Sequence, residues 1–376
     1  MRRRDLLALA GPALLTHAPL RAAENGVTDN EVVLGHTGIL SGPLGEVIKV
    51  MLLGATAVFD EVNQRGGVAG RRIKLVSLDD ELKPDKAVAN YGRLLSEHKA
   101  FAFFGCVGSG TTAAAATLLK DSGAPLVGGY AVADSARDKV QGAAYFVRAT
   151  TGREAQVLLK HLTTLGLTRI GVAHLDNPGG VEVLNLVKKA MADLQLQPAA
   201  AAAIKGDGSN AAAAAATLAD PQIQAVIMYL GGTLGAEVMK AVWERGSQPK
   251  FYGMSIVPGE LSAKVLGERV RGLAISQVVP YPWGQVDPMA GSYRRLMERL
   301  SRPVGYYTFE GFLNAQVMVQ ALERCGRDLT RARLHGVMQG LKLPLAGMGL
   351  DFNGGGHTGS RFVELVQVTL GGRFLR

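Results

Sequence analysis

The sequence predicts an α/β protein made of two Rossmann-like lobes, each with a parallel β-sheet covered by helices on both faces. Three observations carry this prediction. Short β-rich runs alternate with amphipathic helical stretches from residue 31 onward. Nine such runs are more than one ordinary mononucleotide-type sheet needs. A chain of 376 residues is also long enough for two domains that each bury a core.

The predicted strands are short runs of β-forming residues, and the stretches between them show helical patterns of apolar and polar residues. The strands lie at 31–40, 71–80, 101–106, 124–129, 169–176, 199–206, 223–232, 250–255 and 271–279. The helical patterns lie near 47–65, 85–98, 110–122, 152–165, 180–194, 210–219, 234–245, 287–300 and 307–325.

Two alanine-rich segments resemble low-complexity sequence and need separate reasoning. The run at 199–203 follows Gln197-Pro198 and ends at "IKGDG", which favours a strand between buried faces. The run at 211–216 favours a helix, because alanine has the highest helix propensity. Near the C-terminus, residues alternate around Gly371-Gly372, which predicts an antiparallel hairpin.

Residues 1–23 are predicted to be an export signal, which directs the mature chain to the periplasm. A basic start is followed by an apolar stretch from Leu6 to Leu15 and then by the small residues Ala22 and Ala23. The segment "RRDLL" is also similar to the twin-arginine pattern of proteins exported after folding, and both this route and general secretion stay open. A membrane anchor is disfavoured, because the apolar stretch is too short to span a bilayer.

Composition excludes several classes of function. The net charge is +9, and residues 1–23 contribute three of these charges through four arginines and one aspartate. The remaining basic residues are scattered and do not form a patch with interleaved aromatics, so no nucleic acid is expected as a partner. The two cysteines are more than two hundred residues apart, and we expect two unpaired, buried thiols. No Cys/His cluster has metal-ligand spacing, so neither a metal nor a cofactor is predicted.

The segment "FFGCVGSGTTAAAATLL" (103–119) is predicted to be a strand–loop–helix junction that holds an anion. Its glycines have the spacing of a P-loop, but Thr111 stands where that motif needs lysine, so nucleotide binding is disfavoured. What is left is an uncharged cradle of backbone N–H groups, hydroxyls and a helix N-terminus at Gly108, Ser109 and Thr111. Such a cradle suits a single carboxylate, while the alternative is that the hydroxyls only cap their helix.

The sequence contains no recognisable catalytic constellation, so the protein is not expected to be an enzyme. None of the seven histidines belongs to an HExxH motif, and no G-x-S-x-G is present. Asp79 and Asp80 end a strand, and we expect them to cap the following helix and bind its neighbours, with a role as base or metal ligand as the alternative. Four aromatic residues lie at strand ends or just beyond them, where open parallel sheets bind ligands: Tyr130, Tyr229, Tyr281 and Trp283. They form either an apolar wall for a ligand or ordinary packing.

The order and spacing of several motifs resemble a known family. These motifs are "GHTGILSGPLG", "AVFDEVNQRGGVAGRRIKLVSLDDELKPDKAV", "FAFFGCVGSGTTAAA", "VVPYPW" and "TFEGFLNAQVMVQALERCG". Together they are similar to the type I periplasmic solute-binding proteins of ABC transporters, in the Leu/Ile/Val-binding family. The resemblance covers residues from about 30 to about 370.

The resemblance implies the type I periplasmic binding protein fold, with two lobes joined by a three-stranded hinge that close on a solute. It places the first lobe at 27–148 plus 279–350 and the second at 149–278 plus 351–376. It also implies that the partners are a small-molecule ligand and the ABC permease subunits of the inner membrane.

The resemblance carries ligand-binding roles onto further positions. In amino-acid-binding members the cradle holds the ligand carboxylate, and the next strand end adds contacts that correspond here to Tyr130, Ala131 and Val132. The second lobe is expected to contribute Asn177, Gly179, Gly232, Thr233 and Ser255. Ser255 stands where amino-acid-binding members commonly have an acidic residue for the ammonium group. The expected ligand is therefore a carboxylate with an apolar or aromatic body.

The sequence thus predicts a periplasmic receptor of an ABC importer for a small organic carboxylate or an amino-acid-like solute. The alternative is a ligand-sensing regulator or receptor domain of the same fold. The export signal argues against a cytoplasmic sensor.

Overall fold

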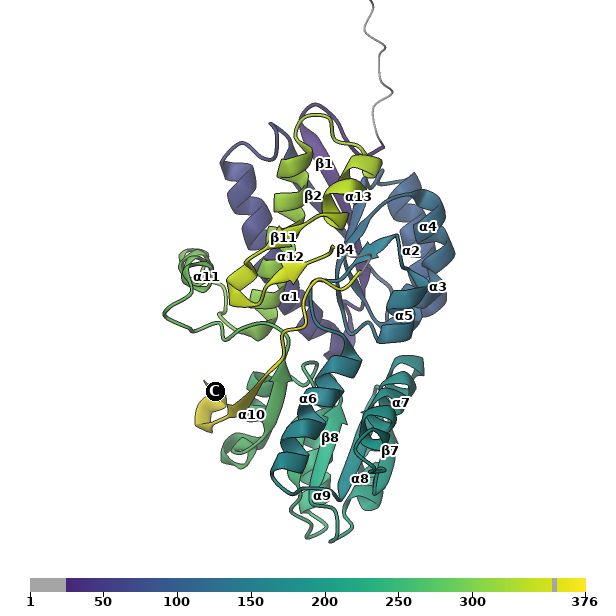
Figure 1. Cartoon of the computed structure of the whole chain (residues 1–376), viewed down its shortest axis with the longest axis vertical. Coiled ribbons are helices and arrows are strands. Elements are labelled where there is room, and N and C mark those ends of the chain that lie inside the picture. Colours follow the sequence, from purple (N-terminus) through teal and green to yellow (C-terminus); the bar gives the residue numbers. More distant parts are fainter. Residues whose placement is uncertain (1–24, 354–356) are drawn as a thin grey trace, which may run out of the picture.

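The computed structural model describes residues 25–353 and 357–376, so the predicted export signal at 1–23 lies outside the described residues. The described chain forms two α/β lobes, with the first uppermost in Figure 1 and the second below it. Each lobe is built on its own sheet.

The first lobe contains a five-stranded parallel sheet in the order β2-β1-β3-β4-β5. Its strands are β1 (Glu31–Gly38), β2 (Arg72–Asp79), β3 (Ala102–Val107), β4 (Leu126–Tyr130) and β5 (Ala144–Tyr145). Its helices are α1 (Gly42–Gln64), α2 (Pro84–Ser96), α3 (Ser109–Ala114), α4 (Ala116–Ser122), α5 (Asp134–Lys139), α11 (Pro288–Arg299), α12 (Tyr306–Cys325) and α13 (Arg331–Gln339). Strand β3 is buried along its whole length, as expected for a central strand covered on both faces.

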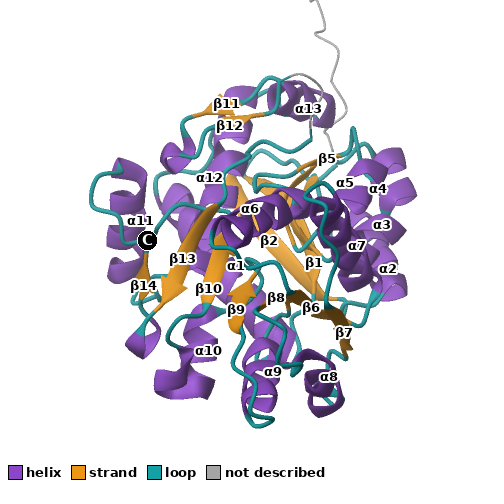
Figure 2. Ribbon diagram, turned by 60° about the horizontal axis from the view of Figure 1, so that its bottom comes forward, coloured by secondary structure: helices purple, strands orange, loops and turns teal. Residues whose placement is uncertain are grey.

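The second lobe contains a seven-stranded sheet in the order β14-β13-β10-β9-β8-β6-β7 (Figure 2). Its strands are β6 (Ile170–Leu175), β7 (Ala200–Ile204), β8 (Ala225–Tyr229), β9 (Lys250–Gly253), β10 (Ala274–Gln277), β13 (Glu364–Val368) and β14 (Phe374–Leu375). Its helices are α6 (Thr151–Thr164), α7 (Pro178–Ala192), α8 (Ala211–Leu218), α9 (Leu234–Trp243) and α10 (Gly259–Leu266). The strands from β6 to β10 pair in parallel, whereas β13 and β14 add an antiparallel edge.

The structure confirms the predicted α/β fold and a strand within each of the nine predicted segments. The first alanine run forms β7 and the second forms α8, while the C-terminal hairpin is β13 and β14. The prediction missed helices α5, α10 and α13. Helix α5 has six residues and α10 has eight, so neither is long enough to show a clear helical period.

The chain passes between the two sheets three times, after β5, after β10 and before β13. The first and third passages pair with each other. The N–H of Phe146 donates to the carbonyl of His357, and the N–H of Gly359 donates to the carbonyl of Phe146. This hydrogen bonding holds two of the three connections side by side.

Helices α1 and α12 pack against each other through a glycine on each helix. A methyl group at Gly54 would overlap the carbonyl oxygen of Thr308, and one at Gly311 would overlap that of Met51. The close approach of the two helix backbones therefore requires glycine at both positions.

Replacing Gly54 with alanine is expected to lower the free energy of unfolding by about 1–3 kcal/mol, because the helices must move apart. Gly92 in α2 is the matched control, since nothing lies within 4 Å of a methyl group placed there. Gly92→Ala should raise stability by about 0.4–1 kcal/mol. Urea unfolding of both variants measures the difference, and equal stabilities would contradict the close crossing.

Both cysteines are free and buried, as predicted. Burial raises the pKa of the Cys106 thiol to about 12 and that of Cys325 to about 11. Within 25–353 and 357–376, no helix combines the length and the apolar character that crossing a membrane requires.

Candidate functional site

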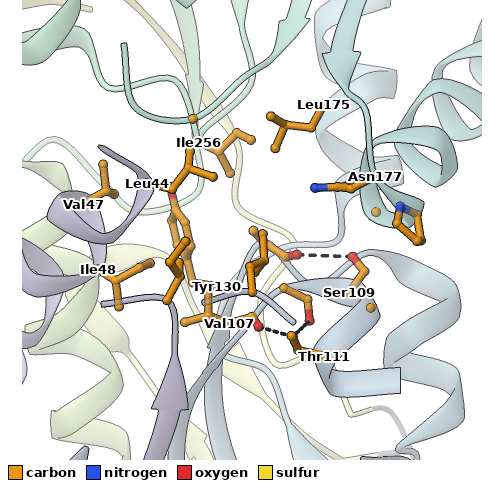
Figure 3. A pocket seen from close by; sticks show the side chains of 18 of the residues that line it. Leu44, Val47, Ile48, Val107, Ser109, Thr111, Tyr130, Leu175, Asn177 and Ile256 are labelled. Carbon is orange, nitrogen blue, oxygen red and sulfur yellow. Dashed lines mark hydrogen bonds between the residues drawn. The ribbon is translucent and has the colours of Figure 1, made fainter. Parts of the chain in front are cut away.

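A cavity lies between the two lobes, where the carboxyl ends of strands from both sheets meet (Figure 3). This is the edge at which open parallel sheets bind ligands. The first lobe contributes Ile39, Leu44, Val47, Ile48, Leu82, Pro84, Val107, Gly108, Ser109, Gly110, Thr111, Tyr130 and Ala131. The second lobe contributes Leu175, Asn177, Pro178, Gly179, Tyr229, Gly231, Gly232 and Ile256. The cavity volume is about 110 Å³, somewhat below the roughly 150 Å³ of an engineered cavity in another protein that admits benzene.

The β3–α3 junction forms one polar end of this cavity. Gly108 follows the last residue of β3 with a φ of 87°, which glycine adopts without strain. Helix α3 then starts at Ser109, and the first N–H groups of a helix have no acceptor within it. The hydroxyl of Thr111 donates to the carbonyls of Val107 and Gly108, the latter at 3.0 Å.

The hydroxyl of Ser109 ties this junction to the end of β4. It donates to the carbonyl of Ala131 at 3.2 Å and accepts from the N–H of Ala133 at 2.9 Å. The protons of both predicted cradle hydroxyls thus go to backbone carbonyls. The capping alternative is therefore wrong, because no side chain caps helix α3 and both hydroxyls instead hold the loop in shape.

Asn177 forms the polar wall of the second lobe. Its side-chain oxygen accepts from the N–H of Gly180 at 2.8 Å and caps helix α7. The next residue is proline, which is favoured at the first helical position because it has no N–H to satisfy. The side-chain nitrogen of Asn177 points into the cavity in Figure 3.

The two lobes touch beside the cavity. Gly179 lies so close to the side chain of Ser109 that a methyl group at Gly179 would be 3.1 Å from the Ser109 Oγ. The N–H of Ser135 in α5 donates to the Glu182 carboxylate in α7 at 2.7 Å. These contacts bring the starts of α3 and α7 together over the cavity.

Apolar side chains form the rest of the lining. Leu82 belongs to a loop that Asp79 and Asp80 hold in shape by accepting from backbone N–H groups, at 2.9 Å for Glu81 and 2.8 Å for Leu82. The two carboxylates therefore shape this loop, but neither caps α2, whose N-cap residue is Lys83, so the predicted capping is wrong. Within the described chain, no three His, Cys, Asp or Glu side chains gather in a group that would hold a metal ion.

No lining residue in the described ranges carries a charge, but a buried ionic cluster lies close to the cavity. Arg148, on the first passage between the lobes, is 3.2 Å from Glu154 of α6 and 3.1 Å from Glu310 of α12. Its guanidinium lies 5.2 Å from the ring centre of Tyr130. The cluster thus joins the first passage between the lobes to α12 of the first lobe and α6 of the second. Tyr130, which lines the cavity, lies between the cluster and the cavity.

Ser255 belongs to the ionic cluster and not to the cavity lining. Its hydroxyl and its N–H both donate to Glu154, at 3.0 and 2.9 Å. Arg148 donates to the same hydroxyl, and Ser276 donates to Glu154 at 2.8 Å. An acidic residue at position 255 would add a third carboxylate beside a single arginine.

The structure brings eight of the thirteen predicted ligand-binding residues into the cavity lining, and five lie elsewhere. The eight are Gly108, Ser109, Thr111, Tyr130, Ala131, Asn177, Gly179 and Gly232. The five are Val132, Thr233, Ser255, Tyr281 and Trp283.

Other contacts explain why the four remaining residues lie outside the cavity lining. Val132 is buried in the apolar cluster of the first lobe, and the hydroxyl of Thr233 donates to Glu237. Tyr281 donates to the carbonyl of Phe374 at 3.2 Å, and Trp283 stacks on the ring of Phe374 with centres 5.6 Å apart. The two aromatics therefore pack against the C-terminal hairpin.

The prediction missed most of the apolar lining. Leu175 is the last residue of β6 and Ile256 follows β9, so the rule for parallel sheets signalled their place. Leu44, Val47 and Ile48 share a face of α1 at helical spacing. This spacing predicts that the face is buried, but it does not identify the surface that the face packs against.

Comparison with known proteins identifies relatives along the chain. A family model for periplasmic binding proteins matches residues 31–373. An amino acid binding protein of Pseudomonas aeruginosa is 32% identical over 124 residues, which are 32% of this chain and only 30% of that protein. A Leu/Ile/Val-binding protein of Citrobacter freundii is 23% identical over 327 residues, or 84% of this chain and 86% of that protein.

The solved structures include a substrate-binding periplasmic protein from Ralstonia solanacearum that is 26% identical to this chain. It superposes with a TM-score of 0.84 over 90% of this chain and 97% of its own.

Proposed function

Because the chain belongs to the periplasmic binding protein family, in which its relatives include Leu/Ile/Val-binding proteins, we propose that it is the solute receptor of an ABC importer. It binds a small organic carboxylate between its lobes and delivers it to the permease subunits of the inner membrane. The members of this family bind solutes and are not enzymes.

One observation supports this function above the others: residues of both lobes line a single, mainly apolar cavity at the strand ends. A solute held there contacts both lobes at once, so binding favours the closed arrangement. We propose that the lobes move as bodies comprising 27–148 plus 279–350 and 149–278 plus 351–376. The closed form is then the one that a permease recognises.

The chemistry of the lining favours a carboxylate over a zwitterionic amino acid. Burying an ammonium group without a carboxylate partner is strongly unfavourable, and no described lining residue offers one. An uncharged set of N–H donors can stabilise a carboxylate. The apolar walls formed by Leu44, Ile48 and Ile256 suit an alkyl or aryl body.

The periplasm is the compartment in which such a receptor works, and the features of residues 1–23 support export. Fractionation of cells that produce the full chain tests this part. The protein should be recovered from the periplasm without residues 1–23. Cytoplasmic recovery of the intact chain would favour the sensing alternative.

Thermal unfolding of the purified mature protein against a panel of solutes tests the ligand class. The panel contains branched-chain amino acids, aromatic carboxylates, aliphatic acids, amides and short peptides. A ligand at one hundred times its Kd stabilises the folded state by about 2.7 kcal/mol, which a shift in Tm reveals. We expect small aliphatic or aromatic carboxylates to shift Tm. A shift by amides or peptides alone would refute the carboxylate proposal.

A further inference from the structure

We propose that the side-chain nitrogen of Asn177 is the donor by which the second lobe holds the solute, and that the cavity selects acids without an ammonium group. This inference rests on the proposed function, since it concerns the same cavity. It assigns a role to one residue and narrows the class of solute.

The helix cap fixes which end of the Asn177 amide faces the solute. The N–H of Gly180 needs an acceptor, and the oxygen of Asn177 supplies it at 2.8 Å. A flipped amide would place two donors against each other and leave the helix uncapped. The nitrogen must therefore face the cavity, as Figure 3 shows. Its two N–H donors make no hydrogen bond with the described residues that the structure records.

The carbonyl groups at this end of the cavity already accept hydrogen bonds from the protein itself. The donors are Gly108 and Val181 N–H groups, the hydroxyls of Ser109 and Thr111, and the ring of His174. In the same order, they bond to the carbonyls of Tyr130, Asn177, Ala131, Val107 and Leu175. The polar end of the cavity thus offers free donors, while these acceptors are engaged.

A solute that presents only acceptors matches this arrangement, and one that also presents an ammonium does not. Each N–H of an ammonium needs an acceptor when it leaves water. The two carboxylates of the ionic cluster beside Tyr130, Glu154 and Glu310, are buried and paired with Arg148. A short alkyl or aryl carboxylate satisfies Asn177 through its oxygens and places its body against the apolar walls.

Matched pairs of acids and amino acids test the selectivity of the cavity. The pairs are 3-methylbutanoate with valine, 4-methylpentanoate with leucine, and 3-phenylpropanoate with phenylalanine. In each pair the two compounds differ by the ammonium group alone. Isothermal titration calorimetry of the mature protein should show at least one acid bound about 100-fold or more tightly than its amino acid. An amino acid that binds as tightly as its acid would overturn the inference.

Two variants separate the role of Asn177 in binding from its role as a cap. Aspartate and serine cap helices about as well as asparagine, so Asn177→Asp and Asn177→Ser should keep the Tm of the free protein within a few degrees. Asn177→Ser shortens the donor and should weaken binding of the preferred acid about 10-fold. Asn177→Asp turns a carboxylate oxygen toward the acid and should weaken binding about 100-fold or more.

Different results would refute the role of Asn177 and the proposed receptor function. If the original protein binds an acid and Asn177→Asp binds it within threefold, another group holds the acid, and the role of Asn177 is refuted while the receptor function stands. If Asn177→Asp does not fold, the affinity of Asn177→Ser decides. If the original protein binds no carboxylate in either titration or thermal unfolding, the proposed ligand class fails, and this inference fails with it.

Discussion

Replacing Arg148 with methionine is expected to lower the free energy of unfolding by about 3–5 kcal/mol. The arginine is 4% exposed and pairs with Glu154 and Glu310, which are themselves 2% and 4% exposed. Methionine fills similar volume but leaves two carboxylates in the protein interior without a cation. The cost therefore comes from the groups that stay behind and not from the loss of the arginine itself.

The loss in Arg148→Met should be largest at alkaline pH. Burial raises the pKa of Glu310, and Arg148 opposes this effect. Without the guanidinium, the pKa of Glu310 rises further. A carboxyl that binds its proton more tightly in the folded state makes stability fall as pH rises, so lowering the pH should recover part of the loss. Urea unfolding at pH 5 and pH 8 measures this difference.

Two comparisons control for loss of packing. Adding Glu310→Gln to Arg148→Met removes one unpaired charge and should restore part of the stability at pH 8. Arg65→Met, at a surface pair with Glu61 in which the arginine is 70% exposed, should change stability by less than about 1 kcal/mol. A double variant no more stable than Arg148→Met would show that the charges do not cause the loss.

The stability of the whole protein should also respond to the titration of Asp80. Burial raises the pKa of this carboxyl from 3.8 to about 6, although the N–H of Leu82 and the hydroxyl of Thr37 donate to it. Between these values the folded state holds a proton that the unfolded state has lost. Stability therefore falls as pH rises from about 4 to about 7, by up to about 3 kcal/mol.

Asp80→Asn should remove this decline, because an amide has no proton to lose and can keep the bond from Leu82. Asp79 is the control with the opposite sign. Burial raises its pKa, but hydrogen bonds from Leu40 N–H, the Ser41 side chain and Glu81 N–H outweigh burial and lower it overall. The stabilisation from Asp79 is lost as pH falls, so Asp79→Asn should make the free energy of unfolding depend less on pH in the acidic range. Chemical unfolding between pH 3.5 and 7.5 measures both, and an unchanged profile in Asp80→Asn would contradict the assignment.

The alternation of strands and helices could be predicted because local patterns carry it. A buried strand such as β3 consists of apolar residues throughout, and α1 shows its buried face at helical spacing. The antiparallel hairpin was signalled by Gly371-Gly372, whose φ values are both 72°. Short helices such as α5 are determined by their tertiary neighbours, because six residues are too few to show a helical period.

The candidate site could be predicted only where a strand end determines a residue's place. Tyr130 ends β4, Gly108 and Asn177 follow β3 and β6, and all three line the cavity. Trp283 also follows a strand, but Phe374, more than ninety residues later in the chain, packs on its ring. Such a partner arrives from another part of the fold, and local spacing contains no signal for it.

The two buried thiols make this chain a convenient starting point for an optical reporter. A thiol reacts through its thiolate, and the high pKa values of Cys106 and Cys325 keep that form scarce at neutral pH. A cysteine introduced on an exposed edge of either lobe would be the site that a maleimide dye modifies. One dye on each lobe would then report the approach of the lobes as a change in energy transfer, with both native cysteines left in place.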